Sequence, residues 1–206
     1  LLPKKSPKDN KLTVCIEMDD VFLFSYTPDE LEGYLYKPRK DHDIFVDLPE
    51  YNTSAYIYKR ENMKELFDYL RDHTEAVLFC TGSQPYVDKI IKAVDPENTV
   101  FKYRLYQDSC NKIEYKPEEI DHLTKDLNRL GRDMKRTVMI DTKPFIFWCN
   151  PDNGIPISEY HGTSLQEPDL LQLVETLKEL QDMPDVRPAL QKKYFIRDAL
   201  RESNLL

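Results

Sequence analysis

Residues 12–25 constrain the fold of this chain more than any other stretch. They read Leu-Thr-Val-Cys-Ile-Glu-Met-Asp-Asp-Val-Phe-Leu-Phe-Ser. A short apolar run bounded by polar residues is typical of a strand that is buried on both faces of a sheet. Glu17, Asp19 and Asp20 follow this strand directly. Carboxylates this close together are costly unless magnesium with a phosphate, hydrogen-bond donors or open solvent neutralises them. The end of this strand is therefore a candidate site.

Two further stretches have the same organisation, an apolar strand that ends in polar residues. Ala-Val-Leu-Phe runs into Cys80 and Thr81, and Thr-Val-Met-Ile runs into Asp141 and Thr142. In a parallel sheet, the polar ends of all three strands meet at the carboxyl edge, where open α/β sheets bind their ligands. We therefore predict an α/β fold, a parallel sheet with helices on both faces, and a pocket at that edge.

The composition excludes some classes of partner and site. With 206 residues, 40% of them hydrophobic, the chain can bury the core of one ordinary domain. Its net charge of -8 argues against nucleic acid, because binding to a phosphate backbone needs a basic surface. The cysteines and histidines are dispersed along the chain. No metal site built from sulfur or imidazole ligands is therefore predicted.

The chain divides into a main domain with a short segment at each end. Residues 1–11 contain four lysines and two prolines without apolar periodicity, and we expect a flexible basic lead-in. Residues 12–182 form the predicted domain, with a β-hairpin insert at about residues 34–60, and residues 183–206 form a tail helix. No apolar run approaches the ~20 residues needed to cross a bilayer. Because the first residue is leucine, a targeting or membrane segment can lie upstream.

Apolar residues at helical spacing predict helices at residues 61–72 and 168–182. Capping residues predict two more, from residue 83 to 93 or 94 and at residues 125–129. Ser83 is the expected N-cap of the former and Thr124 that of the latter, which stops near Gly131.

Ordered motifs at residues 17–25, 123–133 and 151–157 together resemble those of the small C-terminal-domain phosphatases. This FCP homology group is a branch of the haloacid-dehalogenase superfamily. Its opening motif has the form Asp-x-Asp-x-Thr or Val, followed by apolar residues and Ser. The resemblance covers most of the chain, and it implies a haloacid-dehalogenase-like parallel sheet flanked by helices, with a β-hairpin insert.

The resemblance also implies a role for each residue of the pocket. In that family a first Asp attacks phosphorus, and a second Asp protonates the leaving group and later activates water. Glu17 and Asp19 stand at these two positions, and Cys80 and Lys125 stand where a hydroxyl and a lysine hold the phosphate. Magnesium is held there by the first carboxylate, a backbone carbonyl and a late acidic motif. If magnesium binds this chain, its ligands would be Glu17, Asp19 and Asp141.

Three positions depart from the phosphatase pattern. Glu17 replaces the nucleophilic Asp, and its extra methylene moves the attacking oxygen by more than ~1 Å, which costs roughly 10²-fold or more. Cys80 is a poor hydrogen-bond donor in place of the hydroxyl, and Thr81 is shifted by one position. The last motif reads Asp-Thr-Lys-Pro instead of Asp-Asn-Ser-Pro, so that Lys143 adds a cation near the former metal site. We therefore expect an inactive pocket, with no catalytic residue, no metal and no cofactor. That pocket consists of Glu17, Asp19, Cys80, Thr81, Lys125, Asp141 and Thr142.

The chain also resembles the presequence-receptor subunits of the mitochondrial inner-membrane protein translocase. Those subunits likewise lack the nucleophilic Asp and have Asp-Thr in the last motif. The hairpin insert is more similar to that of the active phosphatases. We expect a catalytically inactive interaction or accessory domain in a mitochondrial multi-subunit complex, at the inner membrane or in the intermembrane space, with a role in protein transport. Its partners would be protein subunits, and any membrane association would come from partners or from a segment outside this chain.

Two alternatives stay open. The first is a magnesium-dependent protein phosphoserine phosphatase of reduced activity, with Glu17 as nucleophile and Asp19 as acid and base. The second is a structural accessory subunit with an empty pocket. In that case Asp19, Lys125 and Asp141 form a buried ion-pair network that holds the strand ends together.

Overall fold

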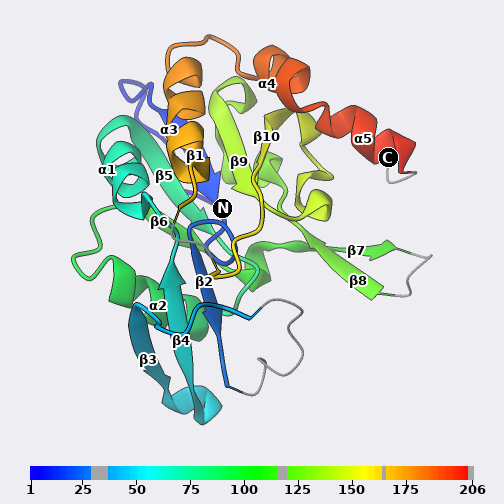
Figure 1. Ribbon diagram of the computed structural model, residues 1–206. Helices are drawn as coiled ribbons and strands as arrows, with labels where there is room; N and C mark the ends of the chain where they lie inside the picture. Colours follow the sequence, from blue (N-terminus) through cyan, green and yellow to red (C-terminus); the bar gives the residue numbers. More distant parts are fainter. Residues whose placement is uncertain (29–36, 116–119, 164–165, 204–206) are drawn as a thin grey trace.

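The core of the fold is a five-stranded sheet in which every pair of neighbouring strands is parallel (Figure 1). The computed structural model describes residues 1–28, 37–115, 120–163 and 166–203. From one edge to the other, the strands are β10 (Gly154–Pro156), β9 (Thr137–Asp141), β1 (Leu12–Ile16), β5 (Thr74–Phe79) and β6 (Tyr103–Leu105). The strand β1 lies in the middle and all its residues are buried, as its uninterrupted apolar run predicts. The predicted α/β fold with a parallel sheet is confirmed.

The central strands alternate their side chains between two hydrophobic clusters, one on each face of the sheet. Val14 and Ile16 belong to the larger cluster, which also contains the apolar faces of three helices. These helices are α1 (Met63–His73), α2 (Gln84–Val94) and α3 (Asp169–Leu180). Figure 1 shows α1 and α3 side by side on this face. Cys15 belongs to the opposite cluster, which is covered by short 3-10 turns and by the helix α5 (Ile196–Glu202). Helices therefore cover both faces, although unequally.

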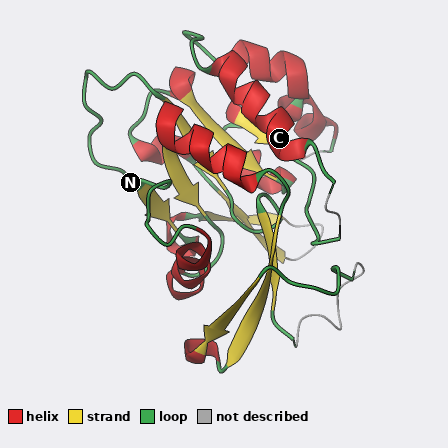
Figure 2. Ribbon diagram, turned by 60° about the vertical axis from the view of Figure 1, so that its left-hand side comes forward, coloured by secondary structure: helices red, strands yellow, loops and turns green. Residues whose placement is uncertain are grey.

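A second, antiparallel sheet is inserted between β1 and α1. Its three strands, in spatial order, are β2 (Leu23–Tyr26), β4 (Thr53–Lys59) and β3 (Ile44–Leu48). The strands β3 and β4 form the predicted hairpin, joined by a 3-10 turn at Pro49–Tyr51. The expected start of the insert, at residue 34, lies outside the described residues. In Figure 2 this insert sheet extends downward, away from the central sheet.

The helix predicted at residues 125–129 is a 3-10 turn, Leu127–Leu130. Thr124 does not cap it, because Thr124 ends the strand β8; the carboxylate of Asp126 caps the turn instead. Gly131, with φ of +69°, ends the turn in the left-handed conformation that glycine tolerates best. The strands before this turn, β7 (Asn111–Tyr115) and β8 (Ile120–Thr124), form a hairpin that projects from the domain (Figure 1).

Both terminal segments contact the main domain. The tail contains two helices, α4 (Arg187–Tyr194) and α5, instead of the single predicted one, because Phe195 between them adopts a left-handed conformation. In the lead-in, the carbonyl of Pro3 accepts a hydrogen bond from Arg132, and Lys5 lies 3.4 Å from Glu75. The flexibility expected of residues 1–11 stays a prediction. Within the described ranges, no helix is long and apolar enough to span a membrane.

Candidate active site

The polar ends of β1, β5 and β9 meet at the carboxyl edge of the central sheet. Lys125, from the loop after β8, lies between two of them. Its Nζ is 2.9 Å from Oε2 of Glu17 and 2.6 Å from Oδ2 of Asp141. All three residues are at most 5% exposed. The structure thus brings together the carboxylates and the lysine that the sequence motifs single out.

Lys125 and Glu17 form a buried ion pair that keeps both groups charged. Burial alone would lower the pKa of Lys125, but the carboxylates of Asp141 and Glu17 outweigh it and raise that pKa. Burial alone would also raise the pKa of Glu17, but the adjacent ammonium group of Lys125 outweighs it and lowers the pKa. Glu17 is therefore an ionised carboxylate in a site that water hardly reaches.

The carboxylate of Glu17 is held by donors from two loops. The N–H of Thr81 lies 2.9 Å from Oε2 and the hydroxyl of Thr81 lies 3.2 Å from the same oxygen. The N–H of Met18 donates to Oε1 at 2.8 Å. Burial and then the carboxylate of Glu17 raise the pKa of the Cys80 thiol well above its usual value, so that Cys80 stays a neutral thiol. Thr81, rather than Cys80, supplies the hydroxyl of this pocket.

Asp19 lies in the loop between β1 and β2 and accepts two hydrogen bonds on one oxygen. The hydroxyl of Ser25 is 2.8 Å from Oδ1, and the hydroxyl of Tyr86 is 3.3 Å from the same atom. Burial, together with the nearby charge of Glu17, raises the pKa of Asp19 to about 7. The sequence-based site omitted both hydroxyl residues. Ser25 ends the first motif, and Tyr86 follows Pro85 in the first turn of α2, the helix end expected at this edge.

The last acidic motif is organised around Asp141. The backbone N–H groups of Thr142 and Lys143 donate to Oδ1 of Asp141 at 2.8 and 3.0 Å. The side chain of Lys143 is directed elsewhere: it pairs with Glu159 and lies 3.4 Å from Asp20. This cation is therefore neutralised at the rim of the site and does not pair with Asp141.

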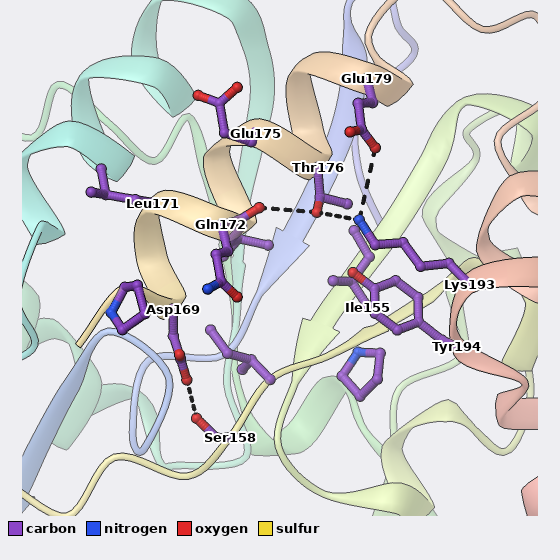
Figure 3. Close-up of a pocket in the computed structure, with 14 residues that line it drawn as sticks. Ile155, Ser158, Asp169, Leu171, Gln172, Glu175, Thr176, Glu179, Lys193 and Tyr194 are labelled. Carbon is purple, nitrogen blue, oxygen red and sulfur yellow. Dashed lines mark hydrogen bonds and ion pairs between the residues drawn. The ribbon is translucent and has the colours of Figure 1, made fainter.

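A groove of about 480 Å³ opens beside Asp19. The insert sheet supplies one wall, with Leu48 and Ala55, and the start of α2 supplies Tyr86. A larger hollow of about 580 Å³ lies between α3, β10 and α4, away from these carboxylates. Figure 3 shows Lys193 in contact with Thr176 and Glu179, and Asp169 with Ser158, so these polar side chains already have partners within the hollow or at its rim. The groove beside Asp19 is the better candidate for a substrate site.

A parallel sheet with a lysine and carboxylates at its carboxyl edge, and an insert after the first strand, defines a haloacid-dehalogenase-like domain. Comparison with solved structures supports this class. The structure of Fcp1, described as an essential RNA polymerase II CTD phosphatase, aligns with a TM-score of 0.56 at 18% identity, over 86% of this chain and 52% of that one. The beryllium fluoride complex of fission yeast Fcp1-R271A gives the same TM-score at 17% identity, over 95% of this chain and 57% of that one. At this level of identity, the likeness shows the fold alone.

The chain belongs to the family of NLI interacting factor-like phosphatases, whose model matches residues 12–187. The CTD small phosphatase-like protein 2 of Dictyostelium discoideum is 32% identical over 98% of this chain, but only over 33% of its own length. The human carboxy-terminal domain RNA polymerase II polypeptide A small phosphatase 2 is 27% identical over 92% of this chain and 65% of its own length. This chain therefore spans about a third of the first relative and about two thirds of the second.

Membership of a phosphatase family contradicts the prediction that this chain is not an enzyme, and that prediction is wrong. The structure shows what offsets the three departures from the phosphatase pattern. Thr81 supplies a hydroxyl beside Cys80, Glu17 retains an ionised carboxylate that Lys125 stabilises, and the side chain of Lys143 pairs with Glu159 instead of Asp141. No finding tests the mitochondrial location, the protein partners or the resemblance to a presequence receptor, so these stay predictions.

Proposed function

We propose that this chain is a phosphatase domain that hydrolyses phosphoserine esters in proteins, with Glu17 as nucleophile and Asp19 as acid and base. One observation carries the proposal. At one edge of the sheet, the carboxylate of Glu17 pairs with Lys125, and the carboxyl group of Asp19, two residues further on, lines an open groove. The family and the names of the relatives support the same class of reaction.

The first half-reaction transfers the phosphoryl group to the protein. A carboxylate oxygen of Glu17 forms a bond to phosphorus while the bond from phosphorus to the serine oxygen breaks. Asp19 gives its proton to that oxygen, and serine leaves as the alcohol. In the second half-reaction, the Asp19 carboxylate takes a proton from water, whose oxygen attacks phosphorus. Phosphate leaves, and the carboxylate of Glu17 is restored.

Several donors around Glu17 are suited to the charge that this reaction moves. The ammonium group of Lys125 and both donors of Thr81 lie within 3.2 Å of Oε2 of Glu17. Fixed donors in a dry site stabilise the oxygens of a transferring phosphoryl group more than donors in water do. The same donors hold the longer glutamate side chain in place. We expect them to reduce, without removing, the cost of its extra methylene.

Magnesium fits the charge balance of this site. The carboxyl groups of Glu17 and Asp141 share a single ammonium group, that of Lys125, while Asp19 carries the transferable proton. No group of three His, Cys, Asp or Glu in the described ranges is placed to hold a metal. Magnesium commonly binds through one or two carboxylates together with waters and substrate phosphate, which Glu17 and Asp141 can supply. When bound, it would neutralise the charge of the phosphoryl oxygens.

Hydrolysis of p-nitrophenyl phosphate with magnesium tests this function. We expect turnover by the native chain and a loss of about 10²-fold or more in the Glu17→Gln variant. In the Asp19→Asn variant the good leaving group still departs without a proton, but hydrolysis of the acyl phosphate slows. Mass spectrometry should then find the phosphoryl group on Glu17. Glu175→Gln, at an exposed carboxylate on α3, is the matched control. Turnover that survives Glu17→Gln, or no turnover by the native chain, would contradict the proposal.

A further inference from the structure

Two hydroxyl groups from different elements converge on a single oxygen of Asp19. Ser25 lies on β2, in the insert sheet, and Tyr86 lies in the first turn of α2. The hydroxyls of Ser25 and Tyr86 lie 2.8 and 3.3 Å from Oδ1, and they also hydrogen-bond to each other. Each hydroxyl has a single proton, so when one of them donates to the other, the second donates to Oδ1. Oδ1 therefore accepts a hydrogen bond in either arrangement. No hydrogen bond from the described residues reaches Oδ2. All three side chains line the groove in which a substrate would lie.

This arrangement distinguishes the two oxygens of Asp19. A carboxyl group that carries a proton has one oxygen that donates and one that only accepts. An O–H that points at Oδ1 competes with a proton on that atom, whichever of the two hydroxyls supplies it. The proton of neutral Asp19 therefore resides on Oδ2, while Oδ1 accepts from the pair of Ser25 and Tyr86. These contacts also fix the rotation of the carboxyl group.

We propose that Ser25 and Tyr86 are positioning residues that hold the transferable proton of Asp19 on Oδ2, toward the departing oxygen of the substrate. This inference rests on the proposed phosphatase function and concerns the same site. Neither hydroxyl touches phosphorus or the leaving group. Each acts through Asp19, so that its loss lets the carboxyl group rotate and place its proton away from the substrate.

A purely structural role would be different. In that case the hydroxyls only join β2 to α2, and their loss would reduce all turnover alike through a smaller folded fraction. The distinction is measurable because the need for a general acid depends on the leaving group. p-Nitrophenolate departs readily without a proton, whereas the more basic phenolate ion departs poorly unless it is protonated.

The experiment compares p-nitrophenyl phosphate with phenyl phosphate, with magnesium present, in the native chain, Ser25→Ala and Tyr86→Phe. We expect kcat on phenyl phosphate to fall at least about tenfold in each variant, and kcat on p-nitrophenyl phosphate to fall less than about threefold. Ser25→Thr, which keeps the hydroxyl, should retain the native ratio of the two activities. Tyr106→Phe is the matched control, because its hydroxyl donates to another carboxylate, that of Asp88, at 2.9 Å.

The ratio of the two activities is independent of how much protein is folded. An unchanged ratio in Ser25→Ala and Tyr86→Phe, with the native chain active on both esters, would overturn the positioning role and leave the phosphatase function intact. A native chain inactive on both esters would overturn the phosphatase function, and this inference with it. A change of ratio in Tyr106→Phe as large as in Tyr86→Phe would show a general effect of removing a phenol hydroxyl, against the proposal.

Discussion

Replacing Lys125 by methionine should destabilise the protein by about 3–5 kcal/mol at pH 7. Lys125 is 1% exposed and its ammonium group binds two buried carboxylates, at 2.9 and 2.6 Å. Removing one partner of a buried ion pair costs about 3–5 kcal/mol, because an uncompensated charge remains. The carboxylates can escape that cost by binding a proton. Keeping a carboxyl group of ordinary pKa 4.5 neutral at pH 7 costs about 3.4 kcal/mol, at about 1.36 kcal/mol per unit.

This escape gives the variant a characteristic pH dependence. Without Lys125, the effect of burial remains, and it raises the pKa of Glu17 above its value in the unfolded chain. A group of raised pKa contributes stability below its unfolded pKa and loses that stability as the pH rises. The deficit of Lys125→Met should therefore shrink on acidification, by about 2 kcal/mol between pH 7 and pH 5.5.

Urea unfolding followed by the fluorescence of the single tryptophan measures both effects. Lys178→Met is the matched control, because Lys178 is exposed and pairs with Glu175 on the surface at 2.7 Å. We expect this control to change the free energy of unfolding by at most about 0.5 kcal/mol. A Lys125→Met variant within about 1 kcal/mol of the native protein, or a deficit independent of pH, would refute the reasoning.

Three further predictions concern stability away from this cluster. Burial would raise the pKa of Glu75, but the hydrogen bond from Arg132 helps to lower it to about 2, so stability should fall as the pH drops from about 4.5 toward 2. Between pH 6 and pH 3, urea unfolding should show a stability loss that is smaller by up to about 2 kcal/mol in Glu75→Gln than in the native protein. An equal loss in both proteins would contradict this. Arg60 is 2% exposed and binds two carboxylates at 2.7 Å. Arg60→Leu should therefore lower the free energy of unfolding in urea by about 3–5 kcal/mol, and a change below about 1 kcal/mol would count against this prediction. A Cβ on Gly154 would lie 2.6 Å from side-chain atoms of Phe147 and Ile196, so Gly154→Ala should cost about 1–3 kcal/mol, and an unchanged thermal midpoint would disprove the crowding.

The sequence predicts the three inner strands of the central sheet, β9, β1 and β5, because they carry apolar runs that suit burial. The edge strands β6 and β10 have three residues each and carry no such run. The helices α1 and α3 follow from helical spacing, and α2 follows from the serine and proline at its start. The strands β3 and β4 follow from two apolar stretches around a turn-rich segment. The prediction of a helix after β8 is wrong, because the local sequence pattern does not distinguish a single 3-10 turn from a short α-helix. The kink at Phe195 has no sequence signal, since phenylalanine rarely adopts a left-handed conformation. It persists because Ile196 and Leu200, on α5, pack in the second hydrophobic cluster.

The chemistry of the site could not be predicted from the motifs alone, because it depends on which atoms reach Glu17 and Asp141. A substitution at one motif position does not show whether a neighbouring residue supplies the missing group. Cys80 reads as the loss of a hydroxyl, yet the backbone turns so that the N–H and the hydroxyl of the next residue, Thr81, both reach Glu17. Lys143 reads as a cation in the metal site, yet its side chain pairs with Glu159 and only its N–H contacts Asp141. In each case a shift of one residue, or the choice between side chain and backbone, reverses the chemical consequence. Substitutions in a strand-end pocket should therefore be judged by the atoms that reach the shared carboxylate, not by the residue types at the motif positions.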